Sequence, residues 1–246
     1  MAMSFQAFKF VELQSVIQFA SITLLYQVGT DMADNEVLYI NLFIILPLSI
    51  FMSWTKPSDH LTKNIPTVSL FSASFLMSIT LSMIFQIGFQ IFVFKSADYF
   101  EDPKTFVECY PSSTNTGNRG HSERVPCTRD TALYLLNIFQ YIIICICFGV
   151  RGTDSEFRQP FYMNKIFFFT LILIIFYNTY KLIYLDQWSK DFYELAEISN
   201  TYRVILLAMV VLNLVLSMFL EYFSTQVFTG WWHQKEIGGS EDTAAK

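Results

Sequence analysis

The chain has 246 residues, of which 53% are hydrophobic and 17% are aromatic, while only 15% are charged. This composition is more apolar than that of a soluble domain of similar length, and it predicts an integral membrane protein. The net charge is −5 and the basic residues are scattered, so the sequence offers no basic surface of the kind that binds nucleic acid. Nucleic acid is therefore not expected among the partners.

Six segments are apolar and long enough to cross a bilayer as helices. A hydrocarbon core of about 30 Å requires about 20 helical residues, and open irregular backbone is too costly in lipid. We therefore predict an all-α, polytopic membrane protein with six transmembrane helices over residues 1–223 and a short disordered cytosolic tail over residues 224–246. The predicted spans are residues 10–28, 38–54, 68–94, 132–150, 166–185 and 203–223.

The connections between the spans alternate in charge, which predicts the orientation of the chain. Short loops on the cytosolic side carry an excess of Lys and Arg. Both termini are therefore expected in the cytosol, and the long loop 95–131 is expected in the lumen. The residues that favour this orientation are Lys9, Lys56, Lys63, Arg151, Arg158 and Lys165 on the cytosolic side, and Asp31, Asp34, Glu36, Asp186, Asp191, Glu194 and Glu197 on the lumenal side.

The four cysteines form two pairs with different expected roles. Cys109 and Cys127 lie in the polar loop 95–131, where they form a disulfide if the loop faces an oxidising lumen and otherwise remain free thiols. Cys145 and Cys147 lie inside an apolar span and are expected to act as small packing residues. The three histidines are far apart, in loops or in the tail, so no metal site is expected.

No motif for binding or hydrolysing a nucleotide occurs in the chain. The sequence lacks a glycine-rich phosphate loop and a G-x-S-x-G nucleophile elbow, and no catalytic domain fits in its loops. We therefore expect neither a catalytic residue nor a cofactor here. No internal repeat is visible either, which argues against the inverted-repeat design of many secondary transporters.

Polar side chains inside the spans are the candidate binding residues, because a charge at the bilayer centre costs at least about 2.5 kcal/mol and is usually kept for a partner or a pathway. Gln14 and Gln18 stand one helical turn apart, so they either line a cavity or bond a neighbouring helix. Asp34 and Asn41 are seven residues apart and lie on nearly one face of the second span. A cation entering from the lumenal side would meet this pair.

Structural roles are expected for most of the other polar residues. Asp31 and Glu36 are interpreted as part of a solvated acidic turn rather than a cation site. Lys181 lies near the lumenal end of the fifth span, and we expect its side chain to extend to the membrane surface. Hydrogen bonds between helices are expected of Gln86, Gln90, Asn137 and Gln140.

Several short segments, in order along the chain, resemble one family. SFQAFKF at residues 4–10, continued by VELQSVIQF, resembles the fifth membrane span of P-type ATPases of the fifth class, subgroup B, which transport polyamines. The resemblance extends over nearly the whole chain, to about Phe223. The further matching segments are DNEVLYINL with PLSIFMSWTKP, PTVSLFS, TALYLLNIFQYII, FRQPFYMN and VLNLVLSMFLE.

The resemblance implies the carboxy-terminal membrane region of a polyamine- or cation-transporting ATPase of late endosomes, lysosomes or another endomembrane. ATP, Mg²⁺ and the DKTGT phosphorylation motif would then belong to a missing amino-terminal part, and the chain would be a fragment or a split subunit. Its partners would be the lipid bilayer, that missing part, and a polyamine or other organic cation.

The resemblance also implies roles for four residues. Gln14, Gln18, Asp34 and Asn41 occupy positions that are associated with substrate binding in the family. The family typically has Tyr where Gln14 stands and Asp where Asn41 stands. The second difference removes a negative charge from the pathway, which affects substrate affinity or substrate identity.

Two alternatives to a pump remain open at this point. The chain can be a non-catalytic membrane adaptor that kept the helical bundle and lost the pump, or a self-contained channel or carrier. A continuous reading frame encoding DKTGT upstream of Met1 would favour the pump, and conduction in liposomes without ATP would favour the channel.

Overall fold

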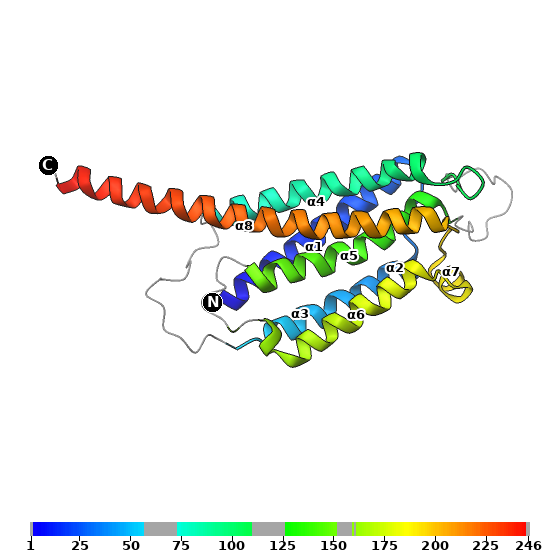
Figure 1. The fold of residues 1–246 in the computed structure, drawn as a ribbon, viewed down its shortest axis with the longest axis horizontal. Coiled ribbons are helices and arrows are strands. Elements are labelled where there is room, and N and C mark those ends of the chain that lie inside the picture. The colour runs from blue at the N-terminus through cyan, green and yellow to red at the C-terminus, as the bar shows by residue number, and fades with distance from the viewer. Residues whose placement is uncertain (1, 57–72, 110–125, 152–158, 160, 245–246) are drawn as a thin grey trace, which may run out of the picture.

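A computed structural model describes residues 2–56, 73–109, 126–151, 159 and 161–244, and every regular element within them is a helix (Figure 1). The prediction of an all-α membrane protein is confirmed, since six segments of the described chain are long and apolar enough to cross a membrane: Ala7–Gln27, Asp34–Ser53, Leu76–Phe100, Thr128–Phe148, Lys165–Ile183 and Asn200–Ser224. The elements are α1 (Ala2–Gln27), α2 (Asp34–Tyr39), η1 (Ile40–Ile45), α3 (Leu46–Ser53), α4 (Ala73–Phe100), α5 (Thr128–Arg151), η4 (Phe161–Met163), α6 (Lys165–Ile183), α7 (Gln187–Tyr193) and α8 (Asn200–Ala244).

Helix α5 forms the centre of the bundle. Within its span 94% of the residues are buried, compared with 33–39% in the other five spans. Helices α1, α4 and α8 pack against it, and α4 also packs against α1 and α8, while α6 and η1 pack against another part of its surface. A helix surrounded in this way exposes almost nothing to lipid, so its polar side chains must find partners inside the protein.

The two ends of the bundle differ in what they hold. Helix α1 begins and α8 ends at the same end in Figure 1, which we call the terminal end. Helix α7 and the beginnings of α5 and α8 lie at the opposite end, which we call the disulfide end after the Cys109–Cys127 bridge. This arrangement agrees with an even number of spans, while the cytosolic location of the termini stays a prediction.

Local features of the sequence explain where α1 ends and where α6 begins. Helix α1 ends where Gly29 adopts φ 77°, a conformation that suits glycine, and the Thr30 amide donates to the Leu25 carbonyl across the turn at 3.2 Å. Helix α6 begins at Asn164, whose side chain accepts from the Phe167 amide at 3.2 Å and donates to the Phe51 carbonyl at 2.8 Å. The second bond holds the start of α6 beside α3.

The second span is divided into three pieces, which we did not predict. Between α2 and α3 the chain forms the π-helix η1, and the Leu46 amide donates to the carbonyl of Asn41, five residues earlier. Pro47 follows directly and has no amide hydrogen to continue an α-helical pattern. A wider π turn next to a proline accommodates this missing donor, and such turns are frequent at functional sites.

Three predicted boundaries differ from the structure. Helix α4 continues to Phe100, six residues beyond the predicted end of the third span, and α5 begins at Thr128. The loop predicted for residues 95–131 is therefore shorter than expected. The predicted start of the third span, at residues 68–72, lies outside the described residues. Helix α8 continues to Ala244 through the segment predicted to be a disordered tail. No proline interrupts residues 224–246, and Gln, Lys and Glu in this segment favour a helix.

Gly88 allows a simple test of the packing on α4. A Cβ atom built at this position meets no atom within 4 Å, so a methyl group fits without any displacement. Gly→Ala in a helix interior is favourable by about 1 kcal/mol. Gly88→Ala should therefore raise the thermal unfolding midpoint of the protein in lipid nanodiscs. A lower midpoint would mean that this face of α4 is packed closely against something.

Candidate functional site

The two glutamines of α1 lie at the edge of the packed bundle. Gln14 and Gln18 are both half-buried, next to the fully buried Leu13 and Ile17. The Oε1 atom of Gln14 is buried and finds no hydrogen-bond partner among the described residues. A buried amide oxygen without a donor is costly, by about 1–3 kcal/mol, unless it serves a ligand or another chain.

Asp34 and Asn41 lie on different parts of the second span. Asp34 is the first residue of α2 and is exposed, while Asn41 is half-buried in η1 and donates from Nδ2 to the Val37 carbonyl at 2.9 Å. The Asn41 side-chain amide is thus held against its own helix, and the Asn41 backbone carbonyl accepts the π-turn bond from the Leu46 amide. The side-chain amide nitrogen and the backbone carbonyl of Asn41 therefore both take part in the irregular turn.

The structure does not join the four predicted binding residues into one cluster. Among the described residues, no hydrogen bond or ion pair connects any two of Gln14, Gln18, Asp34 and Asn41. Helix α1 packs against α3, whereas η1 packs against α5. Their role in substrate binding therefore stays a prediction that rests on the resemblance.

A network of uncharged side chains crosses the centre of the bundle. Gln90 of α4 lies at its hub: its Nε2 atom lies within hydrogen-bond distance of Ser21 Oγ on α1 (2.9 Å), and of Asn137 Oδ1 (2.9 Å) and Gln140 Oε1 (3.0 Å) on α5. All four residues are fully buried. The prediction of hydrogen bonds between helices for Gln90, Asn137 and Gln140 is confirmed.

The network continues through Gln86 to α8. Gln140 donates to Gln86 Oε1 at 2.8 Å, and Gln86 in turn donates to Ser217 Oγ at 3.0 Å. Asn213 of α8 also lies within 3.3 Å of Gln86 Oε1. These side chains bond one another across helix boundaries, so the network connects α1, α4, α5 and α8 as a structural core. Two of its atoms, Gln90 Oε1 and Asn137 Nδ2, find no partner among the described residues.

A buried ion pair lies at the terminal end of the same four helices. Lys9 Nζ donates to Glu221 Oε1 of α8 at 2.8 Å and to Ser78 Oγ of α4 at 2.6 Å, and it lies 4.3 Å from the ring centroid of Phe148 of α5. The sequence predicts only an orienting role for the Lys9 charge, and the ion pair with Glu221 is an additional finding. The feature of the sequence that could have indicated this ion pair is a single acid in the last span, Glu221, and a single lysine at the start of the first.

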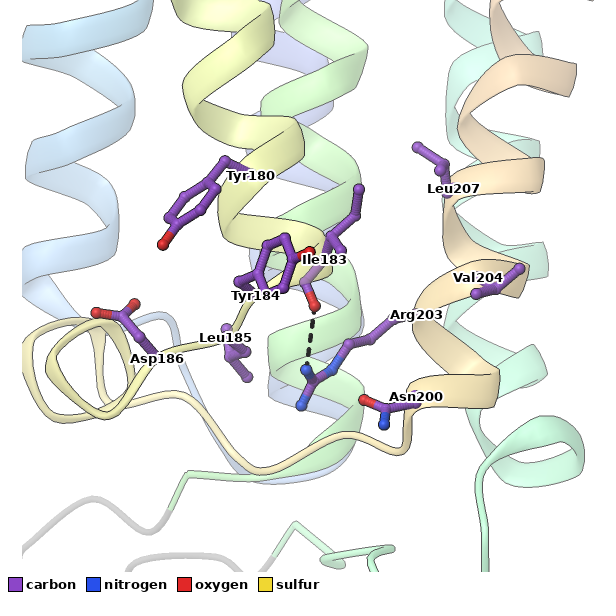
Figure 2. Close-up of a pocket in the computed structure, with 9 residues that line it drawn as sticks. All are labelled: Tyr180, Ile183, Tyr184, Leu185, Asp186, Asn200, Arg203, Val204 and Leu207. Carbon is purple, nitrogen blue, oxygen red and sulfur yellow. Dashed lines mark hydrogen bonds between the residues drawn. The ribbon is translucent and has the colours of Figure 1, made fainter.

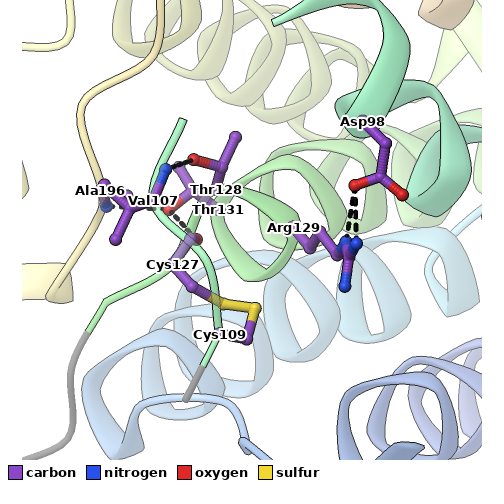
Figure 3. Close-up of a disulfide and its surroundings, with 8 residues drawn as sticks. All are labelled: Asp98, Val107, Cys109, Cys127, Thr128, Arg129, Thr131 and Ala196. Carbon is purple, nitrogen blue, oxygen red and sulfur yellow. Dashed lines mark hydrogen bonds and ion pairs between the residues drawn. A yellow bond between two sulfur atoms is a disulfide. The ribbon is translucent and has the colours of Figure 1, made fainter. Parts of the chain in front are cut away.

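The disulfide end is fastened to the start of α5. Figure 3 shows Cys109 bonded to Cys127, and the next residue, Thr128, accepts from the Val107 amide at 2.9 Å. Thr131 Oγ1 accepts from the Ala196 amide at 2.8 Å, and Arg129 contacts Asp98 of α4 at 2.7 Å. These bonds hold the ends of α4, α5 and the segment before α8 together.

Two side chains at this end, Glu197 and Tyr193, have shifted pKa values. Lys190 donates to Glu197 at 2.9 Å, and this hydrogen bond lowers the pKa of the Glu197 carboxyl. Burial raises the pKa of the Tyr193 hydroxyl well above its usual range, so this group stays neutral at all ordinary pH values. Neither group is poised to exchange a proton near neutral pH.

A cavity of about 610 Å³ opens between α6 and α8 near the disulfide end (Figure 2). Arg203 projects across it and donates to the Ile183 carbonyl at 3.3 Å and, through Nε, to the Ile198 carbonyl at 3.1 Å. Tyr180 and Tyr184 of the α6 side lie along the other wall. The arginine thus connects the last turn of α6 to the start of α8.

Comparison with known proteins gives one consistent group of relatives. The chain is 29% identical over 231 residues to polyamine-transporting ATPase 13A3 of Homo sapiens, an alignment that covers 89% of this chain and 18% of the relative. It is 28% identical over 213 residues to vacuolar cation-transporting ATPase YPK9 of Saccharomyces cerevisiae, covering 85% of this chain and 13% of that protein.

The homologues of this chain are P-type ATPases of subgroup B of the fifth class. The resemblance inferred from the sequence is therefore confirmed. A shorter match, 45% identical over 86 residues, joins the chain to the probable cation-transporting ATPase 1 of Plasmodium falciparum. No protein-family profile matches the chain. The chain spans less than a fifth of the length of the ATPases it matches.

Gln90→Leu tests the structural role of the amide network. The substitution keeps a side chain of similar size but removes the hub, leaving Ser21, Asn137 and Gln140 with lost partners, which costs about 1–3 kcal/mol. We expect a clearly lower thermal midpoint in nanodiscs. Thr80→Val is the control, because Thr80 is exposed on the same helix and bonds only its own backbone. Equal midpoints for both variants would contradict the assignment.

Thiol labelling tests the disulfide. In protein isolated without reductant and then denatured, we expect an alkylating reagent to modify Cys145 and Cys147 only, because Cys109 and Cys127 are bonded. Mass spectrometry after reduction should show four modified cysteines. Modification of all four before reduction would rule the bond out.

Proposed function

We propose that this chain forms the membrane portion of an ATP-driven cation or polyamine transporter, supplying both the supporting bundle and part of the transport path. The observation that carries the proposal is the alignment of 89% of the chain with polyamine-transporting ATPases, together with six segments able to span a membrane. ATP hydrolysis and phosphorylation are assigned to an amino-terminal part of the same transporter. A late endosomal or lysosomal membrane is the proposed location.

The four predicted residues are proposed to line the path for the cation. A polyamine is a thin chain of ammonium groups separated by methylenes, so carboxylate and amide oxygens and aromatic faces suit it. The exposed Asp34 at the disulfide end attracts the cation, and Asn41, Gln14 and Gln18 offer amide oxygens deeper in the membrane. The unbonded Oε1 of Gln14 supports this role, because an ammonium group would supply its missing donor.

No step that uses ATP or Mg²⁺ is assigned to this chain. Among the described residues, no three His, Cys, Asp or Glu side chains are grouped so that they can hold a metal ion. The chain's own contribution is mechanical and electrostatic. The amide network of α5 connects four helices, and the second span contains the π-helix η1, which packs against α5.

Two charge changes on the second span test the path. In the complete transporter that contains this chain, Asn41→Asp should lower the polyamine concentration for half-maximal ATP turnover by about threefold or more, because a charge-assisted bond is stronger than a neutral one. Asp34→Asn should raise that concentration. The measurement is ATP turnover in proteoliposomes as a function of spermine concentration.

The matched control is Asp191→Asn, which removes an exposed carboxylate from α7 at the same end of the bundle. This variant should behave like the unmodified transporter. If both second-span variants also keep an unchanged half-maximal concentration, Asp34 and Asn41 do not belong to the path.

A further inference from the structure

Lys181 of α6 is buried near the disulfide end, although we predicted that its side chain extends to the membrane surface. Only 2% of the residue is exposed. A lysine ammonium taken out of water must be compensated by several partners, because burying an unpaired charge is very costly. The groups around its Nζ atom must therefore compensate the loss of hydration.

Three tyrosine rings surround the Lys181 ammonium. Nζ lies 3.5 Å from the ring centroid of Tyr193, 4.4 Å from that of Tyr39 and 4.6 Å from that of Tyr134. It also donates a hydrogen bond to the Tyr134 hydroxyl at 2.6 Å. Several aromatic faces around one cation are the arrangement with which proteins bind organic ammonium ions.

Two carboxylates also act on the charge of Lys181. Glu36 interacts favourably with the Lys181 charge, and so does Asp186 just beyond the end of α6. Glu36 is fully buried, contrary to the solvated turn that we predicted, and its Oε2 accepts from the Ala33 amide at 2.9 Å. A carboxylate whose charge acts on the Lys181 ammonium is thus fixed at the start of α2.

The walls of the cage are positioned by contacts that do not involve Lys181. The Tyr39 hydroxyl donates to Asn178 Oδ1 at 3.0 Å, and Asn178 Nδ2 donates to the Ile174 carbonyl at 2.8 Å. The Tyr193 ring meets the Tyr39 ring edge-on at 5.2 Å and the Phe192 ring at 4.9 Å. The rings therefore keep their orientation when the lysine side chain is shortened.

An aromatic cavity of about 380 Å³ adjoins the cage and shares two of its walls, Tyr39 and Tyr193. Its other lining residues come from the second span, α6 and α7, and include Tyr177, Trp188 and Phe192. A small amine entering this cavity would contact Tyr39 and Tyr193, two of the three rings that enclose Lys181. The cavity thus provides room next to the cage for a ligand or for a displaced lysine side chain.

We propose that the cage of Tyr39, Tyr134, Tyr193 and Glu36 is a binding site for a primary alkylammonium group, and that the side chain of Lys181 is its tethered occupant. A tethered group competes at an effective concentration of about millimolar or more. A free amine therefore binds weakly to the unmodified protein. Shortening residue 181 vacates the site.

Lys181→Ala with n-butylammonium as the probe tests this inference. The variant, purified in nanodiscs, should have a lower thermal midpoint than the unmodified protein, and millimolar n-butylammonium should raise that midpoint in a saturable way. The unmodified protein and Lys190→Ala, which removes a lysine outside the cage, should show no such rise. The test needs neither ATP nor transport, so its outcome is separate from that of the proposed function.

n-Butanol distinguishes ammonium recognition from simple filling of a void. It has nearly the same size and shape as the probe but no charge, so it should leave the midpoint of Lys181→Ala unchanged. An equal rise with both compounds, or no rise with n-butylammonium, would overturn the proposal.

A second comparison applies if Lys181→Ala is not recovered as a folded protein. Lys181→Met fills the same space with an uncharged chain, and Tyr193→Leu removes the nearest ring. If the ring and the ammonium interact as proposed, the midpoint losses of the two variants are not additive in the double variant. Additive losses would contradict the cage.

Discussion

The structure depends on the hydrogen bonds that the buried amide side chains of α5 make with the neighbouring helices. Lipid provides no hydrogen bonds, and α5 is surrounded by helices along almost its whole length. Asn137 and Gln140 can be accommodated at this depth only because Gln90 and Gln86 of α4 face them, with Ser21 and Ser217 beyond. Such bonds determine the rotation and the axial position of each helix, which apolar contacts alone leave open.

The two buried lysines show two ways to place a cation in an apolar bundle. Lys9 is neutralised by direct contact with a carboxylate, Glu221, and by a serine hydroxyl. Lys181 instead lies among aromatic faces, with one phenolic hydroxyl as its closest oxygen. Removing either lysine leaves a different surface behind. The first is a buried anion that needs a counter-charge, and the second is a preformed aromatic pocket.

The sequence predicts the number of spans because that depends on length and apolarity, which are local properties. It also predicts the bonds of Gln86, Gln90, Asn137 and Gln140, since helical spacing within each span indicates a common face. It does not predict Glu36 or Lys181 correctly, because each lies at the end of a span, where solvent exposure is the usual outcome. Lys181 is enclosed by Tyr39 of α2, Tyr134 of α5 and Tyr193 of α7, which only the tertiary packing brings together. The π-helix η1 was missed for a similar reason, since Pro47 alone does not specify how the chain accommodates it.

The position of the disulfide has a consequence for the covalent continuity of the protein. Cys109 lies nine residues after the end of α4 and Cys127 immediately precedes α5, so the bond closes a loop between the two helices. A protease that cuts the chain between the two cysteines would leave the amino-terminal and carboxy-terminal halves of the bundle covalently joined. Such a nick is invisible on a denaturing gel without reductant and appears as two fragments with it. After such a cut the two halves of the bundle would stay linked through the Cys109–Cys127 bond.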